Sequence, residues 1–266
     1  MEAGLPPRYE IRTLGPEHIE WASAIVMHTN MFDSPVWPVV YPDGKAARLY
    51  EAVRNVDYLV RHQVLSGHSL GVFDGEYRFK RDESKATGGK LYWDEADTEA
   101  DGDRLLEQMD FPLVSVALAY DGAHPLDPAK MKGLVRALPL YATFYSALER
   151  LDARPRGSWE AEKPGQLLLR NATSTRGDYQ GRGLMKTMAR HMMRAAAARG
   201  FRGIQIETLA DAVEHVWARP PPPYSGRVVA TFETLTYEEV GEDGVRVYPF
   251  RPADQKATKI YCNLRP

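Results

Sequence analysis

Cysteine is almost absent from this sequence, and so are long apolar runs and an excess of charge of either sign. The single cysteine, Cys262, excludes an internal disulfide and a cysteine-rich zinc cluster, and we expect no metal site. No stretch approaches the roughly 20 apolar residues of a membrane-spanning helix. The 34 Lys and Arg residues against 36 Asp and Glu leave a net charge of -2, which excludes a general binder of nucleic acid.

The start of the sequence also lacks a recognisable targeting signal. Residues 1–10 contain neither the basic nor the apolar region of a secretory signal, so we expect a cytoplasmic protein without a membrane partner. What the chain does contain is ordinary for a folded protein, with 44% hydrophobic and 26% charged residues. Its 266 residues suit one large domain, and we predict a single domain over residues 1–266.

Hydrophobic periodicity predicts a mixture of helices and strands. Apolar residues at spacings of three and four predict helices over residues 16–32, 45–65, 128–151, 183–199 and 209–217. Alternating or continuous apolar runs predict strands over residues 9–14, 68–73, 113–120, 166–174, 201–207, 228–237, 245–250 and 259–264. Pro139 lies inside one predicted helix and is expected to kink or split it. This order predicts an α+β protein with helices on both sides of one sheet.

The most informative run is TSTRGDYQGRGL, residues 173–184, between a predicted strand and a predicted helix. Gly181 and Gly183 let the backbone approach a ligand closely, and the unpaired N–H groups of a helix start favour an anion. Arg176 and Arg182 add positive charge. The run is not a Walker loop, because no Gly-Lys-Ser/Thr follows, and it lacks the glycine spacing of a dinucleotide fingerprint.

This run resembles the acyl-CoA signature of the GNAT superfamily of CoA-dependent N-acyltransferases, Arg/Gln-x-x-Gly-x-Gly/Ala. Here the signature reads Gln180-Gly181-Arg182-Gly183-Leu184-Met185, and Tyr179 supplies the aromatic residue that usually precedes it. Met185 departs from the pattern, because the family has a small residue there. The C-terminal tail is similar to that of uncharacterised fungal members of the family.

The resemblance implies a GNAT-like mixed, mostly antiparallel central sheet with a V-shaped splay, flanked by helices on both sides. It also implies an inserted segment at about 75–150 and a C-terminal antiparallel strand extension at 225–266. Acetyl-CoA is the implied co-substrate, with its pantetheine arm along the strand before the signature and its pyrophosphate on the backbone amides of the loop. The implied CoA-binding residues are Thr173, Ser174, Thr175, Arg176, Gln180, Gly181, Arg182, Gly183, Leu184 and Met185.

Four titratable residues are candidates for proton transfer. Glu207 ends an apolar strand, where burial would raise its pKa and make it a general base; its alternative role is a cap or a solvated carboxylate at the start of helix 209–217. His215, on that helix, is the alternative base, although a lone histidine is more often structural. The family often uses a tyrosine on this helix as the general acid, and Trp217 stands there instead. Tyr261 or Tyr224 would then supply the acid.

The acceptor site is expected at the connection between helices 16–32 and 45–65, which covers the acceptor in the family. Phe32, Trp37 and Tyr41 make this connection aromatic, and Asn171 joins them as a substrate-binding candidate. Such a lining favours a small, partly apolar or aromatic amine. Ordinary packing of a proline-rich loop would explain the same residues.

The sequence therefore supports one leading hypothesis and two rivals. The first is an N-acetyltransferase, a monomer or homodimer, that moves an acetyl group from acetyl-CoA to a primary amine of a small molecule by direct attack in a ternary complex. The second is a catalytically silent GNAT-like module that binds CoA or a metabolite, favoured by Met185 and Trp217. The third is a phosphate-binding scaffold unrelated to CoA.

Overall fold

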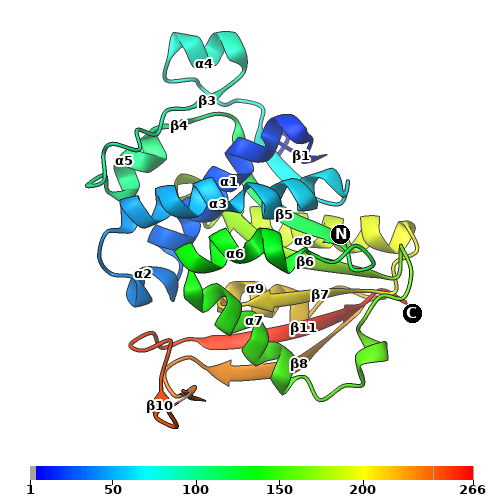
Figure 1. Cartoon of the computed structure of the whole chain (residues 1–266). Helices are drawn as coiled ribbons and strands as arrows, with labels where there is room; N and C mark the ends of the chain where they lie inside the picture. The colour runs from blue at the N-terminus through cyan, green and yellow to red at the C-terminus, as the bar shows by residue number, and fades with distance from the viewer. Residues whose placement is uncertain (1–3, 242, 266) are drawn as a thin grey trace.

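The computed structural model describes residues 4–241 and 243–265, and its centre is a seven-stranded sheet (Figure 1). The strands lie in the order β1 (Tyr9–Thr13), β2 (Leu70–Asp74), β5 (Leu113–Asp121), β6 (Leu167–Thr175), β7 (Gly203–Thr208), β11 (Lys256–Asn263) and β8 (Ser225–Glu233). β5 is mainly apolar and buried along its whole length, as suits a strand covered on both faces.

Only β6 and β7 run parallel to each other, and their pairing is short. It extends from Leu167 opposite Gly203 to Arg170 opposite Ile206, while every other neighbouring pair in the sheet is antiparallel. Beyond Arg170, β6 continues to Thr175 paired with β5 alone. The two parallel strands therefore diverge, and the expected mixed, mostly antiparallel sheet with a V-shaped splay is confirmed.

Helices cover both faces of this sheet. One face carries α1 (Ile19–His28), α3 (Lys45–Leu65), α6 (Pro128–Ala137) and α7 (Pro139–Leu151), whose apolar side chains share one hydrophobic cluster. The other carries α8 (Leu184–Ala198) and α9 (Asp211–Ala218), which share a second cluster with Ile204 and Ile206 of β7. Figure 1 shows α3, α6 and α7 in front of the sheet and α8 behind it. Pro139 splits the helix predicted over 128–151 into α6 and α7.

Short elements connect these layers. They are η1 (Pro16–His18), a π-helical turn η2 (Thr29–Asp33), α2 (Trp37–Val40), α4 (Asp82–Thr87), β3 (Lys90–Leu91), α5 (Gly102–Glu107), β4 (Met109–Asp110), η3 (Arg156–Ser158), η4 (Gly177–Tyr179), β9 (Glu239–Val240) and β10 (Arg246–Val247). α4, β3, β4 and α5 stand away from the main sheet (Figure 1). The insertion expected over 75–150 thus includes β5, which lies inside the main sheet, so the protruding part is confined to the residues between β2 and β5.

The C-terminal segment completes the sheet. β11 pairs antiparallel with both β7 and β8, and β9 forms a separate antiparallel pair with β10. Among the described residues, none of the helices is both long and apolar enough to cross a membrane. Over the same residues, no group of three or more His, Cys, Asp or Glu side chains is placed to hold a metal ion.

Candidate active site

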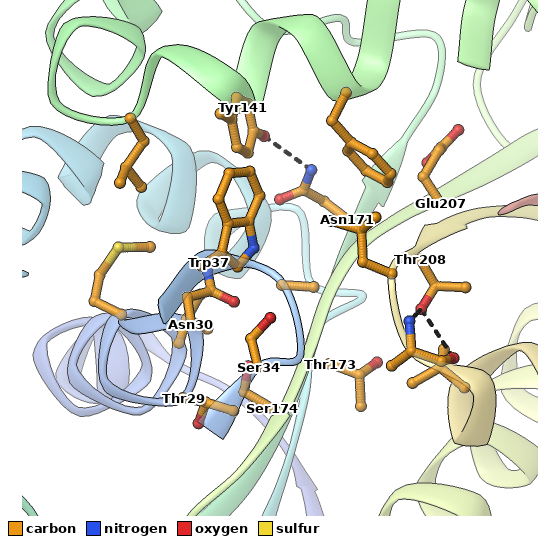
Figure 2. A pocket seen from close by; sticks show the side chains of 18 of the residues that line it. Thr29, Asn30, Ser34, Trp37, Tyr141, Asn171, Thr173, Ser174, Glu207 and Thr208 are labelled. Atoms are coloured by element: carbon orange, nitrogen blue, oxygen red, sulfur yellow. Dashed lines mark hydrogen bonds between the residues drawn. The ribbon is translucent and has the colours of Figure 1, made fainter. Parts of the chain in front are cut away.

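A β-bulge in β6 marks the point where the two parallel strands separate. Leu118 of β5 pairs with Ala172 and Ala119 pairs with Arg170, so Asn171 is the extra residue of the bulge. Its amide Nδ2 donates hydrogen bonds to the hydroxyl oxygens of Tyr141 (3.0 Å) and Tyr145 (2.6 Å), both on α7. The bulge therefore directs the predicted substrate residue Asn171 toward α7 (Figure 2).

The signature loop joins the open end of β6 to α8. Gly181 and Gly183 both have left-handed backbone, with φ of 75° and 73°, and a Cβ at either would meet open space. α8 begins at the buried Leu184, so the amides of its first turn have no intrahelical partner. Arg182 is exposed, and its guanidinium donates to the Tyr9 hydroxyl at 2.9 Å. Open space above unpaired amides at a helix start is a suitable cradle for a phosphate.

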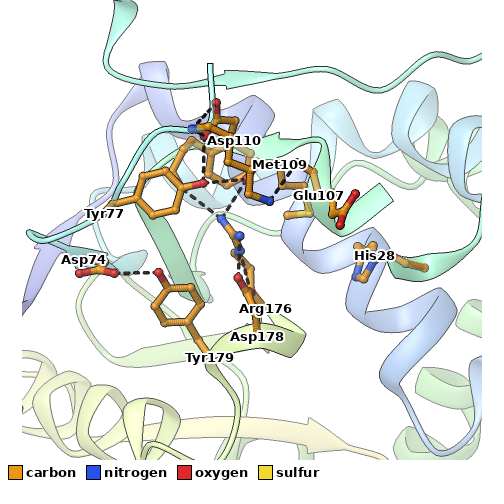
Figure 3. A network of polar contacts seen from close by, with 12 residues as sticks. His28, Asp74, Tyr77, Glu107, Met109, Asp110, Arg176, Asp178 and Tyr179 are labelled. Carbon is orange, nitrogen blue, oxygen red and sulfur yellow. Dashed lines mark hydrogen bonds and ion pairs between the residues drawn. The ribbon is translucent and has the colours of Figure 1, made fainter. Parts of the chain in front are cut away.

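Arg176 does not face this cradle, contrary to the sequence-based prediction. Its side chain is 1% exposed, and Nη1 donates to the carbonyl oxygens of Met109 (3.0 Å) and Phe111 (3.1 Å). Nε and Nη2 donate to the Asp178 carboxylate, as Figure 3 shows. The guanidinium is therefore occupied in anchoring the start of the signature loop to the protruding segment.

A second anchor fixes the same loop to β2. The Tyr179 hydroxyl donates to Asp74 Oδ2 at 2.7 Å (Figure 3). Arg8 pairs with the same carboxylate. Burial acts to raise the pKa of Asp74, but the hydrogen bonds from Arg8 and Tyr179 outweigh it and leave that pKa below its ordinary value. The aromatic residue before the signature thus holds the loop in place.

A cavity of about 220 Å³ occupies the splay and extends between α1, α2 and α7. Its wall is mainly apolar, and the larger apolar side chains are Val26, Met27, Trp37, Leu59, Leu134, Leu138, Phe144, Leu209 and Val213. Thr173 and Ser174 border it on the signature side, and Asn171, Tyr141 and Glu207 border it on the other (Figure 2). Gln180 of the signature and Tyr145 of α7 also line it. One continuous space therefore joins the two halves of the expected site.

Glu207 lies at this cavity as a half-buried carboxylate on β7. Burial raises its pKa above the ordinary glutamate value, partly offset by the positive charges of Lys259 and Arg170. Gln205 Nε2 donates to Glu207 Oε1 at 3.1 Å. The alternative role as a helix cap is wrong, because the N-cap residue of α9 is Ala210 and it has no side-chain cap.

Two tyrosines that the sequence analysis missed complete the acceptor side. Tyr141 and Tyr145 are one turn apart on α7, and the Tyr145 hydroxyl donates to the backbone carbonyl of Asn171 at 3.2 Å. Burial raises the pKa of Tyr141 to about 12 and that of Tyr145 well above its ordinary value, so both stay protonated near neutral pH. Their i, i+4 spacing on one helix face was a signal that could have paired them.

Three of the predicted candidates for proton transfer lie elsewhere. His215 is exposed on α9, contacts Arg219 and borders a different, acidic cavity beside β8 and β11. Tyr261 packs under the guanidinium of Arg154, 5.3 Å from its ring centre, and does not line the main cavity; nor does Tyr224. The structure therefore does not bring these side chains to Glu207, because each lies away from the splay.

Of the three aromatic residues predicted to bind the acceptor, one lines the cavity and two do not. Trp37 lines the cavity, whereas Tyr41 stacks behind it with ring centres 6.3 Å apart. Phe32 packs against His28 and lies so close to Gly102 that a Cβ added there would clash with its ring. Phe32 therefore supports the protruding segment. Of the remaining CoA candidates, Met185 is half-buried against the hydrophobic cluster of α8 and α9. The hydroxyl groups of Thr175 and Ser115 share a hydrogen bond of 2.7 Å.

Comparison with known proteins bears on the fold. No family model and no curated protein matches the sequence. Among solved structures, the C-terminal condensation domain of Ebony, in complex with β-alanyl-dopamine, superposes with a TM-score of 0.60 at 16% identity, covering 95% of this chain and 97% of that chain. Arylalkylamine N-acetyltransferase 2 from Aedes aegypti gives 0.58 at 12% identity, covering 97% and 99%.

The polyamine N-acetyltransferase of Drosophila melanogaster, described as catalysing the formation of N-acetylagmatine, gives a TM-score of 0.55 at 13% identity, covering 96% of this chain and 99% of that chain. At such identities the likeness concerns the fold. The chain has the fold of these N-acetyltransferases over nearly its whole length, which confirms the fold that the GNAT resemblance implied.

Proposed function

We propose that the protein is an N-acetyltransferase that moves the acetyl group of acetyl-CoA to the primary amine of a small molecule, by direct attack in a ternary complex. One observation carries the proposal: a single cavity joins the open edge of β6 and the signature loop to a half-buried carboxylate with a raised pKa. The N-acetyltransferase fold of the solved neighbours supports it.

The residues of the donor side fit a CoA molecule. Beyond Arg170 the edge of β6 that faces β7 has no strand partner, so its backbone groups are available to a pantetheine arm. The unpaired amides at the start of α8, under Gly181 and Gly183, suit the pyrophosphate. Bound there, acetyl-CoA supplies an activated acyl group as a thioester.

The acceptor side fits an amine that arrives as an ammonium ion. Trp37, Phe144 and their neighbours bury the carbon skeleton of the amine, and Glu207 attracts its positive charge. An amine with an ordinary pKa near ~10.4 must lose a proton before it attacks. The raised pKa of Glu207 makes its carboxylate a stronger base than an exposed glutamate, so Glu207 takes this proton.

The acceptor class follows from the size and lining of the cavity. A volume of about 220 Å³ with aromatic walls suits a small amine better than a protein tail. The solved neighbours are described as acting on arylalkylamines, polyamines and agmatine. We further propose a cytoplasmic monomer or homodimer without a nucleic-acid partner, which the near-zero net charge supports.

The test is a thiol-release assay with acetyl-CoA against arylalkylamines, polyamines, agmatine, amino acids and aminoglycosides. We expect release above background with at least one amine, together with calorimetric binding of CoA. Binding of CoA without turnover on any amine would identify the silent module instead. A thermal shift with nucleotides but none with CoA would reject both and leave the phosphate-binding scaffold.

A further inference from the structure

A buried arginine with unused hydrogen-bond donors lies at the point of the splay. Arg170 is the last residue of β6 paired with β7, opposite Ile206, and it is 3% exposed. The residues two positions before and after it lie on opposite faces of the sheet. Leu168 belongs to the hydrophobic cluster of α8 and α9, whereas Ala172 packs against the cluster of α1, α3, α6 and α7. Because of the bulge, the side chain of Arg170 shares the α8 and α9 face with Leu168 while still bordering the main cavity.

The guanidinium of Arg170 is only partly satisfied. Nη1 donates to Thr173 Oγ1 at 3.0 Å, whereas the buried Nε and Nη2 have no hydrogen-bond partner. Trp217 of α9 lies beside it, with the guanidinium carbon 5.8 Å from its ring centre. The Trp217 side chain is fully buried, and its indole Nε1 also lacks a partner. Three unused donors are therefore buried close together next to the cavity.

A charged group in this position requires a negative partner. Burial lowers the pKa of Arg170 only to about 10, so the guanidinium is still positive at neutral pH. Glu207 and Tyr145 act on it electrostatically, but none of the described carboxylates forms an ion pair with it. Buried polar groups normally find partners, and unpaired ones point to a ligand or to an ordered water.

We propose that Arg170 is a catalytic residue that stabilises the thiolate of CoA as it leaves the acyl group. The inference rests on the proposed function. Thr173, which the guanidinium contacts through Nη1, lies on the open part of β6 that suits the pantetheine arm, so this partly unsatisfied guanidinium lies beside the place where that arm ends. The nearby Leu209, Ala210 and Val213 keep this corner apolar, which strengthens an interaction between charges.

The step balances without a tyrosine acid. The amine nitrogen bonds to the acyl carbon, the carbon–sulfur bond breaks, and its electron pair goes to sulfur. Glu207 takes one proton from the ammonium before attack, and after attack the nitrogen passes a second proton to water. Arg170 keeps its protons and donates N–H groups to the thiolate, which later takes one proton from water. This explains why Trp217, whose indole is not an acid, can stand on α9.

The test compares CoA with desulfo-CoA, which lacks the thiol. An opposite charge within ~4–6 Å lowers a pKa by about 1–3 pH units, so for a thiol with an ordinary pKa of about 8.5 the preference of wild-type protein for CoA should be roughly 8- to 180-fold greater at pH 9 than at pH 6. Arg170→Met should lose this pH-dependent preference and most of its kcat, with desulfo-CoA affinity unchanged. Arg170→Lys should keep part of both. Arg48→Met, which removes a half-buried arginine that does not line the cavity, is the control.

Three results would overturn the proposal. An Arg170→Met variant that folds, shown by circular dichroism, and retains kcat and the preference for CoA would remove Arg170 from the reaction. A wild-type preference for malonyl-CoA or succinyl-CoA over acetyl-CoA that Arg170→Met abolishes would assign the guanidinium to an acyl carboxylate. Wild-type protein that binds no CoA would overturn the proposed function as well, so the two failures are distinguishable.

Discussion

Replacement of Glu207 by glutamine separates catalysis from stability. The amide keeps the shape of the side chain and its contact with Gln205 but cannot accept a proton. Loss of a general base typically costs 10²–10⁴ in rate, which corresponds to about 2.7–5.4 kcal/mol in activation free energy. We therefore expect kcat for the best amine to fall by that factor, while the affinity for acetyl-CoA is unchanged because the donor contacts lie on β6 and α8.

The pH dependence of the rate should change with it. In the wild type, activity should rise with pH as Glu207 ionises, and the midpoint of this acidic limb should lie above the ordinary glutamate pKa because burial raises it. Glu207→Gln should lose the limb. Glu214→Gln and His215→Asn are the controls, since both side chains border the separate acidic cavity.

Stability should move in the opposite direction to rate. A carboxyl group whose pKa is raised by folding stabilises the protein while protonated. This contribution is lost as the pH rises through the raised pKa, and it amounts to about 1.36 kcal/mol for each pH unit by which folding raises that pKa. Glu207→Gln, which is neutral at all pH values, should lack this decline, so its melting temperature at pH 8 should equal or exceed that of the wild type. A purely structural carboxylate would give a destabilised variant.

The measurements are steady-state thiol release from pH 5 to 9 and thermal unfolding over the same range. A Glu207→Gln variant within tenfold of the wild-type rate, with its acidic limb intact, would refute the assignment of the base. If His215→Asn removed the limb instead, the two roles would be exchanged. If neither change mattered, the amine would lose its proton through water and only the donor side of the proposal would stand.

Three further variants test other parts of the molecule. Gly183→Val should abolish CoA binding measured by calorimetry. Gly200→Val is its control, because it places the same branched side chain in a left-handed backbone conformation at the other end of α8, so it should be similarly destabilised but bind CoA normally. Trp37→Ala should raise the amine KM at least tenfold with acetyl-CoA KM unchanged, because it removes an apolar wall. Asp152→Asn should lower the melting temperature by roughly 6–20 °C in scanning calorimetry, because it leaves the buried Lys259 unpaired.

Local features of the fold were predictable from the sequence. The signature loop combines left-handed glycines with a strand before it and an amphipathic helix after it, and each of these depends on near neighbours only. The division at Pro139 follows from its missing N–H and fixed φ. The extent of the insertion was not predictable, because β5 joins β2 and β6 through pairings between distant residues that no local pattern encodes.

The parts of the site that depend on local sequence patterns were also predictable. Glu207 and Trp37 were identified because strand ends and aromatic loops are visible in the sequence, and both line the cavity. Arg176 was assigned to phosphate because its charge lies near the signature, but its side chain points into the protein, where backbone carbonyls accept its hydrogen bonds. Tyr141 and Tyr145 were missed because only the packing of α7 over the bulge brings them to Asn171.

The splay places two opposite charges where the two halves of the reaction meet. Arg170 and Glu207 lie on adjacent strands, one facing α8 and α9 and the other facing α7, and both border one cavity. Each partly offsets the cost of burying the other, since Arg170 lowers the pKa of Glu207 and Glu207 raises that of Arg170. A direct ion pair would neutralise both. Because the strands separate just beyond Arg170, the carboxylate stays free for an ammonium proton and the guanidinium for a thiolate.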